Sequence, residues 1–311
     1  MTSSVNARMW QADMNGRILN IKRFEIHDGD GLRTTIFLKG CPLRCKWCHN
    51  PESLAPKAEL GFYSDKCAAC GDCISVCKAG AHSIKDGVHS FERAKCVGCG
   101  ECAEECTFGA LIFYGESVAP YDILPKLLED KEFYDNSGGG VTLSGGEPLL
   151  QADFSAELLK LLKENGINTA VDTCLFASRE NLEKVVPYTD TFLVDIKAID
   201  RDVHKALTGQ YNDIILDNIR YLDAIGMPME IRIPYVPNQN AGEMTGIADF
   251  IASLHSVKGV RVLPYHSLSS TKYASLEIDY TLDKDSAPIP TSTEVENARK
   301  ILEAHGINVL R

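Results

Sequence analysis

The chain has 311 residues and a formal net charge of −11, and 44% of its residues are hydrophobic. This length suits one large domain or one domain with an insert, and the acidic balance argues against nucleic acid as a partner. The sequence has no run of 18 apolar residues and no apolar core in its first 16 residues, so we expect no membrane span, no signal peptide and a cytoplasmic location. Twelve cysteines in such a chain indicate metal ligands and not disulfides.

The first predicted strand, residues 34–38 (TTIFL), leads into a cysteine-rich loop at residues 40–53. The loop holds three cysteines with the spacing C-x3-C-x2-C, which are Cys41, Cys45 and Cys48. Metal sites that only hold structure usually have four protein ligands. A [4Fe–4S] cluster on three cysteines leaves one iron open, and an open metal position is a place for cofactor or substrate chemistry.

Eight further cysteines form two runs with the spacing C-x2-C-x2-C-x3-C, at a constant offset of 29 positions. The first run is Cys67, Cys70, Cys73 and Cys77, and the second is Cys96, Cys99, Cys102 and Cys106. This spacing resembles that of bacterial two-cluster ferredoxins, in which the fourth cysteine of each run binds the other cluster. The resemblance implies one [4Fe–4S] cluster on Cys67, Cys70, Cys73 and Cys106, and a second on Cys96, Cys99, Cys102 and Cys77. Lys78 and Thr107 replace the usual prolines, and a pair of zinc knuckles is the alternative interpretation.

The rest of the chain alternates predicted strands with predicted helices, which favours βα units and a parallel sheet. The further strands are residues 141–144, 168–173, 192–197, 229–235 and 260–265, and the helices include residues 122–134, 152–166 and 213–226. We therefore expect an α/β fold, a partial (β/α)6 barrel formed by residues 16–51 and 116–311. Residues 52–115 would form an inserted ferredoxin-like domain. A flatter doubly wound sheet is the alternative, and residues 286–311 are expected to form a loop, a helix and a short extended end.

The polar motifs lie in or just after the C-terminal halves of these strands. They are SGGEP (residues 144–148), Asp172, DIK (residues 195–197), Arg232 and His266. In βα barrels this end of the strands carries the active site. The remaining cysteine, Cys174, is interpreted as a small core residue and not as a fourth ligand of the first cysteine group.

In combination, these motifs resemble those of radical S-adenosylmethionine (SAM) enzymes. The strings TTIFLKGCPLRCKWCHNPES, GVTLSGGEPLLQ, DIK and LPYH are similar to those of glycyl radical enzyme activating enzymes, the group of pyruvate formate-lyase activating enzyme. The resemblance runs from about Asn20 to His266, and the insert resembles that of the subgroup with two additional clusters. One departure is the string HDGDG at residues 27–31, where many relatives read DGPG.

The resemblance implies a role for each motif. Cys41, Cys45 and Cys48 would bind the catalytic cluster, and SAM would fill the fourth position through its amino nitrogen and carboxylate oxygen. Reduction would cleave SAM into methionine and a 5′-deoxyadenosyl radical, which takes a hydrogen atom from a backbone glycine of a partner enzyme. The residues implied in binding SAM are Trp47, His49, Gly145, Gly146, Glu147, Asp195, Ile196, Lys197, Arg232 and His266. Asp172 would bind a monovalent cation.

The implied cofactors are three [4Fe–4S] clusters and SAM, and the implied partners are the C-terminal glycine loop of a glycyl radical enzyme and a reductant such as flavodoxin or ferredoxin. Two alternative functions stay open. One is a radical peptide-modifying enzyme of the sulfatase-maturating type, whose extra cysteines tend to follow the core. The other is an electron carrier, which has no need of GGEP, DIK or an open cluster. Neither the partner enzyme nor its substrate can be identified from these residues.

Overall fold

The computed structural model describes residues 15–283 and 285–311. Residues 1–14, where we expect no signal peptide, lie outside the described part. Among the described residues, no helix has the length and apolar character needed to cross a membrane.

A single nine-stranded sheet forms the main body, in the order β13-β12-β11-β10-β9-β8-β2-β1-β7. Its strands are β1 (Gly16–Glu25), β2 (Arg33–Leu38), β7 (Glu116–Val118), β8 (Gly140–Gly145), β9 (Asn168–Thr173), β10 (Thr191–Asp195), β11 (Met229–Tyr235), β12 (Val257–Pro264) and β13 (Val309–Leu310). From β2 to β13 all neighbours are parallel, whereas β1 is antiparallel to both β2 and β7. The six predicted strands correspond to β2 and β8–β12, so the expected α/β fold with a mostly parallel sheet is confirmed.

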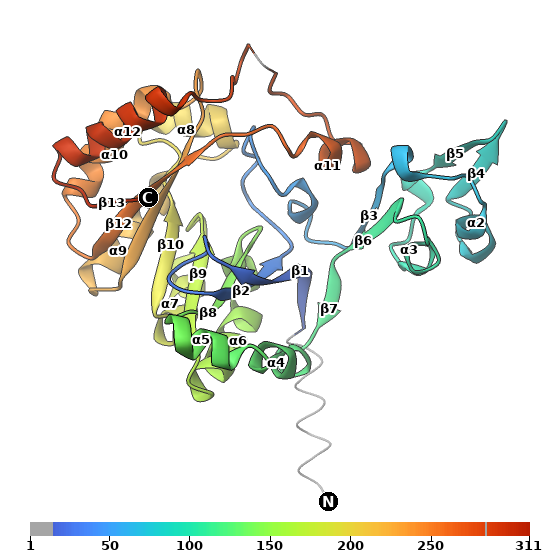
Figure 1. Cartoon of the computed structure of the whole chain (residues 1–311), viewed down its shortest axis with the longest axis horizontal. Helices are drawn as coiled ribbons and strands as arrows, with labels where there is room; N and C mark the ends of the chain where they lie inside the picture. The colour runs from blue at the N-terminus through green and yellow to red at the C-terminus, as the bar shows by residue number, and fades with distance from the viewer. Residues whose placement is uncertain (1–14, 284) are drawn as a thin grey trace, which may run out of the picture.

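Helices pack along one side of this sheet (Figure 1). They are α4 (Pro120–Leu128), α5 (Lys131–Ser137), α6 (Ala152–Glu164), α7 (Arg179–Val185), α8 (Arg201–Thr208), α9 (Asp213–Ala224), α10 (Met244–Ala252) and α12 (Ser292–Ala304). Short 3-10 turns are η5 (Pro148–Gln151), η6 (Val186–Tyr188) and η7 (Ala241–Glu243). The single helix predicted at residues 122–134 is two helices, which are separated at Glu129 and Asp130, where the Asp130 side chain binds Arg23 and Thr34.

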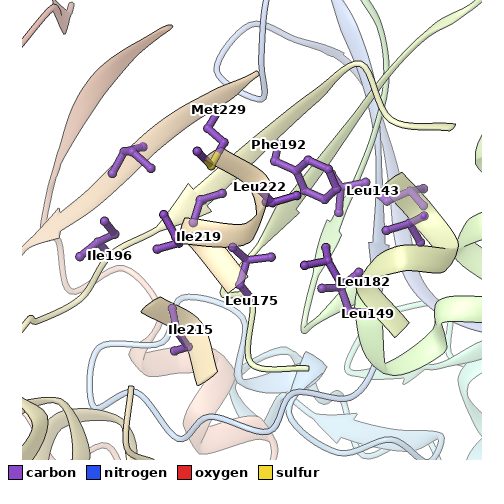
Figure 2. Close-up of a cluster of buried hydrophobic side chains, with 14 of the residues drawn as sticks. Leu143, Leu149, Leu175, Leu182, Phe192, Ile196, Ile215, Ile219, Leu222 and Met229 are labelled. Carbon is purple, nitrogen blue, oxygen red and sulfur yellow. The ribbon is translucent and has the colours of Figure 1, made fainter. Parts of the chain in front are cut away.

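Apolar side chains from the helices and the sheet form one continuous core. Figure 2 shows part of it, where residues of β8, β10, β11, α7 and α9 pack together. The labelled residues are Leu143, Leu149, Leu175, Leu182, Phe192, Ile196, Ile215, Ile219, Leu222 and Met229. Removal of this apolar surface from water is the main stabilising term of the fold. It fixes the positions at which the strands end, and therefore the positions of the polar motifs that follow them.

The cysteine-rich segment between β2 and α4 forms a smaller lobe that projects from the main body (Figure 1). Its elements are β3 (Glu59–Phe62) paired with β6 (Leu111–Tyr114), the hairpin of β4 (His82–Lys85) and β5 (Val88–Phe91), α2 (Asp72–Val76), α3 (Glu101–Glu104), η3 (Ser64–Lys66) and η4 (Arg93–Lys95). The lobe has its own apolar cluster, which includes Leu60, Phe91 and Leu111. On the main-body side, η2 (Pro51–Ser53) and α11 (Ser270–Ser275) adjoin the base of the lobe.

Candidate active site

An open cavity lies at the C-terminal edge of the parallel strands. The predicted residues that line it are Cys41, Cys45, Cys48, Trp47, His49, Gly145, Gly146, Asp172, Asp195, Lys197 and Arg232. Segments far apart in the sequence thus meet at one place, as the positions of the motifs after their strands suggest. Glu147, Ile196 and His266 are absent from the lining. Thr173, which follows Asp172 at the end of its strand, also lines the cavity, and Cys174, Val236 and Tyr265 are additional lining residues that the sequence did not single out for this site.

Backbone hydrogen bonds hold the loop with the three cysteines against the main body. The N–H of Arg44 donates to Thr208 O at 2.7 Å and that of Lys46 to Leu207 O at 3.1 Å, so the loop is joined to the C-terminal end of α8. Cys48 N–H donates to Cys45 O at 3.1 Å and closes a turn between these two cysteines. The three thiols therefore come from one short loop whose shape is set by its neighbours and not only by its own sequence.

The thiols of this loop have shifted pKa values. Burial raises the pKa of Cys45 to about 12 and that of Cys48 to about 11, because a buried thiolate loses its hydration. The pKa of Cys41 is lowered, chiefly by the neighbouring Cys174 side chain. Thiolates at Cys45 and Cys48 therefore need a compensating positive charge, which bound iron supplies. Three cysteines on one cavity wall, with no fourth from the same loop, fit an iron–sulfur cluster that keeps one iron open.

The two glycines of SGGEP are required by close contacts between backbones. Gly145 has φ +108°, and a Cβ there would lie 2.3 Å from Leu38 N. A Cβ on Gly146 would lie 2.2 Å from Gly40 O. Glu147 N–H also donates to Gly40 O at 2.7 Å, so the end of β8 is bound directly to the start of the cysteine loop. The glycines thus place the two motifs side by side, in addition to keeping this cavity wall free of side chains.

The carboxylate of Glu147 is fully buried beneath the cavity and is occupied by neighbouring donors. Thr173 Oγ1 donates to it at 2.7 Å, Cys174 N at 2.8 Å and Leu149 N at 3.0 Å. The Cys174 thiol also donates to it, at 2.9 Å. Burial raises the pKa of Glu147, and these hydrogen bonds oppose that shift. Cys174 is buried, as expected of a core residue, but it also lines the cavity beside Cys41.

Lys197 supplies a fixed positive charge in the cavity. Its Nζ donates to Asp195 Oδ2 at 2.6 Å, and the side chain is 8% exposed. Burial lowers the pKa of Lys197, but Asp195 and the nearby thiols of Cys45 and Cys174 raise it above its usual value, so the ammonium group stays charged. The side chain of Ile196 points the other way, into the core shown in Figure 2, so only its backbone faces this region.

Arg232 joins several carboxylates at the opposite wall. Its Nη1 lies 3.5 Å from Asp172 Oδ1 and 3.6 Å from Asp28 Oδ1, and its Nη2 donates to His27 O. Ser144 Oγ donates to Asp172 Oδ2 at 2.6 Å. The pKa of Asp172 is raised to about 7, chiefly by burial and also by Asp195 and Asp28, whereas Arg232 and the Ser144 hydrogen bond oppose the shift. No role was inferred for the HDGDG string, yet it places Asp28 in this network.

Aromatic side chains form the remaining wall. Trp47 packs in a small apolar cluster with Val236 and Tyr265, and it is 5% exposed. The ring of His49 stacks on that of His266, with centroids 4.0 Å apart, and His49 Nε2 lies 3.2 Å from His266 O. Burial lowers the pKa of His49 to about 4, so its imidazole is neutral at pH 7. His266 is itself exposed and supports His49 from outside the cavity.

The smaller lobe contains two more cysteine-lined cavities. One is lined by Cys67, Cys70, Cys73 and Cys106, and the other by Cys77, Cys96, Cys99 and Cys102. Each set combines three cysteines of one run with the fourth of the other run. Gly71 and Gly100 begin α2 and α3 with φ +93° and +87°, so both runs use the same left-handed turn between their second and third cysteines.

Comparison with known proteins relates the chain to one family. The model described as the radical SAM superfamily matches residues 35–251. The choline trimethylamine-lyase activating enzyme of Oleidesulfovibrio alaskensis is 40% identical, over 87% of this chain and 90% of the relative. The trans-4-hydroxy-L-proline dehydratase activating enzyme of Clostridioides difficile is 38% identical, over 95% and 98%. The benzylsuccinate synthase activating enzyme of Thauera aromatica is 40% identical, over 83% and 81%.

Proposed function

Because the chain belongs to the radical SAM superfamily, and within it to the activating enzymes of glycyl radical enzymes, we propose that it abstracts a hydrogen atom from a backbone glycine of a partner enzyme. The observation that carries this proposal is that the three cysteines of C-x3-C-x2-C line one cavity together with Lys197, Asp195 and Arg232. Cys41, Cys45 and Cys48 would hold a [4Fe–4S] cluster there, which would supply the electron for cleaving SAM into methionine and a 5′-deoxyadenosyl radical.

The chain's own residues bind and orient SAM in this proposal. The charged Lys197, held by Asp195 at 2.6 Å, suits the carboxylate of its methionine part. The backbone of Gly145 and Gly146 leaves room for the same part, whereas the side chain of Glu147 holds Thr173 and Cys174 in place from below. These contacts would hold SAM beside the cysteine loop.

A monovalent cation at Asp172 is part of the same proposal. Burial raises the pKa of the Asp172 carboxylate most, and the like charges of Asp195 and Asp28 nearby add to that shift. Arg232 offsets only part of this charge, at 3.5 Å from Asp172. A bound cation would relieve the remaining repulsion, and replacing potassium by a large organic cation during the assay tests for it.

The smaller lobe, residues 52–115, is proposed to bind two further [4Fe–4S] clusters. Support comes from the grouping of the eight cysteines into two cavities, each combining three cysteines of one run with one of the other. Cys70 and Cys99 are exposed, so both sites are open to an external reductant such as flavodoxin or ferredoxin. The lobe could pass electrons inward or dock the partner. Measuring reduction of the catalytic cluster in variants that lack the lobe cysteines distinguishes these two roles.

The partner is a glycyl radical enzyme, whose C-terminal glycine loop would bind at the cavity. The relatives are named for activating a choline trimethylamine-lyase, a trans-4-hydroxy-L-proline dehydratase and a benzylsuccinate synthase, at 38–40% identity to this chain. Because these identities are nearly equal, they favour no one partner. The partner has to be found by direct assay.

The experiment is anaerobic reconstitution with iron and sulfide, followed by reductant, SAM and each of a panel of glycyl radical enzymes. We expect the electron paramagnetic resonance doublet of a glycyl radical with one partner, and 5′-deoxyadenosine in parallel. The Cys45→Ala variant is the control and should give neither signal. Deoxyadenosine without a doublet from any partner would favour a peptide-modifying enzyme instead. A protein with all its clusters but neither signal would contradict the radical function.

A further inference from the structure

Two histidines of the smaller lobe lie between its two cysteine-lined cavities. His89, on β5, lines the cavity of Cys67 and Cys73, and His82, on β4, lines the cavity of Cys77. The rings meet, with His82 Nδ1 3.1 Å from His89 Nε2 and the centroids 5.1 Å apart. One hydrogen-bonded pair of imidazoles therefore spans the distance from one cavity to the other.

His89 also contacts two of the cysteines. Its Nδ1 lies 3.4 Å from Cys67 Sγ, and its Nε2 lies 3.6 Å from Cys73 Sγ. A neutral imidazole has one N–H, so the partner of one ring nitrogen determines where the proton lies. When His82 donates from Nδ1 to Nε2 of His89, the proton of His89 is on Nδ1 and faces Cys67. An iron-bound thiolate can only accept, so this arrangement gives Cys67 a donor, whereas Nε2 of His89 has no proton to give to Cys73.

The packing of the hairpin fixes both rings. His82 is 5% exposed and stacks on Phe91, with centroids 5.0 Å apart and an interplanar angle of 24°. His89 meets the ring of Phe62 edge-on at 4.6 Å. The pairs His82–Phe91 and Ile84–His89 are cross-strand partners in the β4–β5 ladder. The histidines are thus held in this orientation by the strands and not by the cysteines alone.

The two cysteine-lined cavities differ in the hydrogen bonds that their sulfur atoms receive. In the described residues, no side chain donates a hydrogen bond to the cysteines of the second cavity, which are Cys77, Cys96, Cys99 and Cys102. Cys77 receives only the backbone N–H of Ala81, at 3.3 Å. Cys67 has an equivalent backbone donor, Ala69 N at 3.4 Å, and the His89 contact is additional. The histidine pair therefore makes two similar sites unequal.

We propose that His89, oriented by His82, donates a hydrogen bond from Nδ1 to the Cys67 thiolate of the cluster in the Cys67 cavity and gives that cluster the higher reduction potential of the lobe's two. A hydrogen bond to sulfur stabilises the more negative, reduced state of a cluster, and so raises its potential. The cluster in the Cys67 cavity is then reduced first. His89 is a positioning residue in this scheme and ligates no iron. The inference rests on the two-cluster part of the proposed function.

The test is a redox titration of the reconstituted full-length protein with dithionite and mediators, followed by electron paramagnetic resonance. In the wild type we expect two different midpoint potentials for the lobe clusters. His89→Leu should lower the higher of the two and leave the other two clusters of the protein unchanged. His89→Asn, which keeps an N–H near the position of Nδ1, should restore most of the shift. His82→Leu should lower the same potential by less, and His255→Leu, which removes an exposed imidazole, should change none.

Iron and sulfide analysis separates the two possible failures. A wild-type protein that holds fewer than two clusters in the lobe contradicts the two-cluster function itself. Intact clusters with unchanged potentials in His89→Leu overturn the role of His89 alone. If the His89→Leu variant loses its cluster, the potential is measured in the His82→Leu variant instead. Among the described residues, His82 makes no hydrogen bond to a cysteine sulfur, so we expect this variant to keep the cluster. An unchanged potential in that variant would overturn the orienting role and with it the proposal.

Discussion

Glu147 accepts hydrogen bonds from both the backbone N–H and the thiol of Cys174, at 2.8 and 2.9 Å. These residues lie on neighbouring strand ends, β8 and β9, so the carboxylate joins two walls of the cavity from below. Thr173 and Leu149 add two more donors to the same group. Most of the acceptor capacity of Glu147 is thereby used within the protein.

Replacing Glu147 by Ala should therefore act on stability first. The change leaves four buried donors without their acceptor, and we expect a loss of about 3 kcal/mol in the free energy of unfolding. Cys174→Ala removes only the thiol donor and should cost about 1 kcal/mol. Anaerobic guanidinium denaturation of both variants, without clusters, measures the difference. Equal losses in the two variants would contradict a structural role for the carboxylate.

Lys197→Gln should weaken SAM binding without removing the catalytic cluster. The substitution keeps a polar side chain but removes the positive charge that Asp195 holds, so an anionic ligand loses its partner and Asp195 adds repulsion. We expect the dissociation constant for SAM to rise by about 10- to 100-fold, equivalent to about 1.4–2.8 kcal/mol. Equilibrium dialysis gives the constant, and iron analysis serves as the control. A normal constant would remove Lys197 from the SAM site.

Much of the fold was predictable because its signals are local. The strand at residues 34–38 is a short run of β-branched and apolar residues, and the structure has β2 at Arg33–Leu38. The spacing of Cys41, Cys45 and Cys48 is also local, because one loop carries all three. The strand β1 was missed because its pairing with β2 has irregularities at Ile18/Asn20 and Lys22/Glu25, which disturb the alternation of apolar residues.

The remaining features of the site depend on contacts between distant positions. Asp28 lies between β1 and β2, whereas Arg232 lies on β11, several strands away in the sheet. No local pattern in HDGDG signals the ion pair that they form. Cys174 was correctly predicted to be buried, but its contact with the cysteine loop depends on how β9 ends beside β8. The glycines of SGGEP were assigned to ligand approach, whereas the structure adds a backbone contact with Gly40 that only the three-dimensional packing reveals.

Lys272, on α11, should stabilise the base of the cysteine loop. Its Nζ lies 2.5 Å from Glu52 Oε1 and donates to His49 O at 3.1 Å, and the Glu52 side chain is 6% exposed. Lys272→Met leaves that buried carboxylate unpaired and should cost about 2 kcal/mol, because a broken buried pair loses more than an exposed one. The double variant with Glu52→Gln should recover part of the loss. A denaturation cycle of the four proteins measures this coupling, and strictly additive losses would argue against it.

Asp130 should make the stability of the fold sensitive to acid. Its carboxylate accepts hydrogen bonds from Arg23, and Thr34 donates to it at 3.1 Å. The hydrogen bond with Arg23 lowers the pKa of Asp130 below its usual value. A group with a lowered folded-state pKa stabilises the fold above its unfolded-state pKa, about 3.9, and this contribution disappears as the pH falls through the folded-state value.

The Asp130→Asn variant should therefore be less stable than the wild type by about 2 kcal/mol at pH 7. This difference in the free energy of unfolding should narrow steadily below about pH 4, where the wild-type carboxylate becomes protonated. Urea denaturation of both cluster-free proteins from pH 7 down to about pH 2 measures it. Glu129→Gln is a suitable control, because Glu129 is exposed and lies 3.4 Å from Arg23. A gap that stays constant with pH would show that charge on Asp130 is not the cause.

Gly146→Ala should remove the catalytic cluster selectively. The new Cβ would lie 2.2 Å from Gly40 O, and a backbone carbonyl can move only if the cysteine loop that follows it also moves. Cys41 comes directly after Gly40, so its thiol would leave the other two. If the protein holds the three [4Fe–4S] clusters proposed for it, about one third of the iron should be lost while the lobe keeps the rest. Gly166→Ala is the control, since a Cβ there meets nothing within 4 Å although φ is +70°. It should lower stability by about 1 kcal/mol and keep all the iron. Full iron content in Gly146→Ala would mean that the end of β8 does not set the position of the cysteine loop.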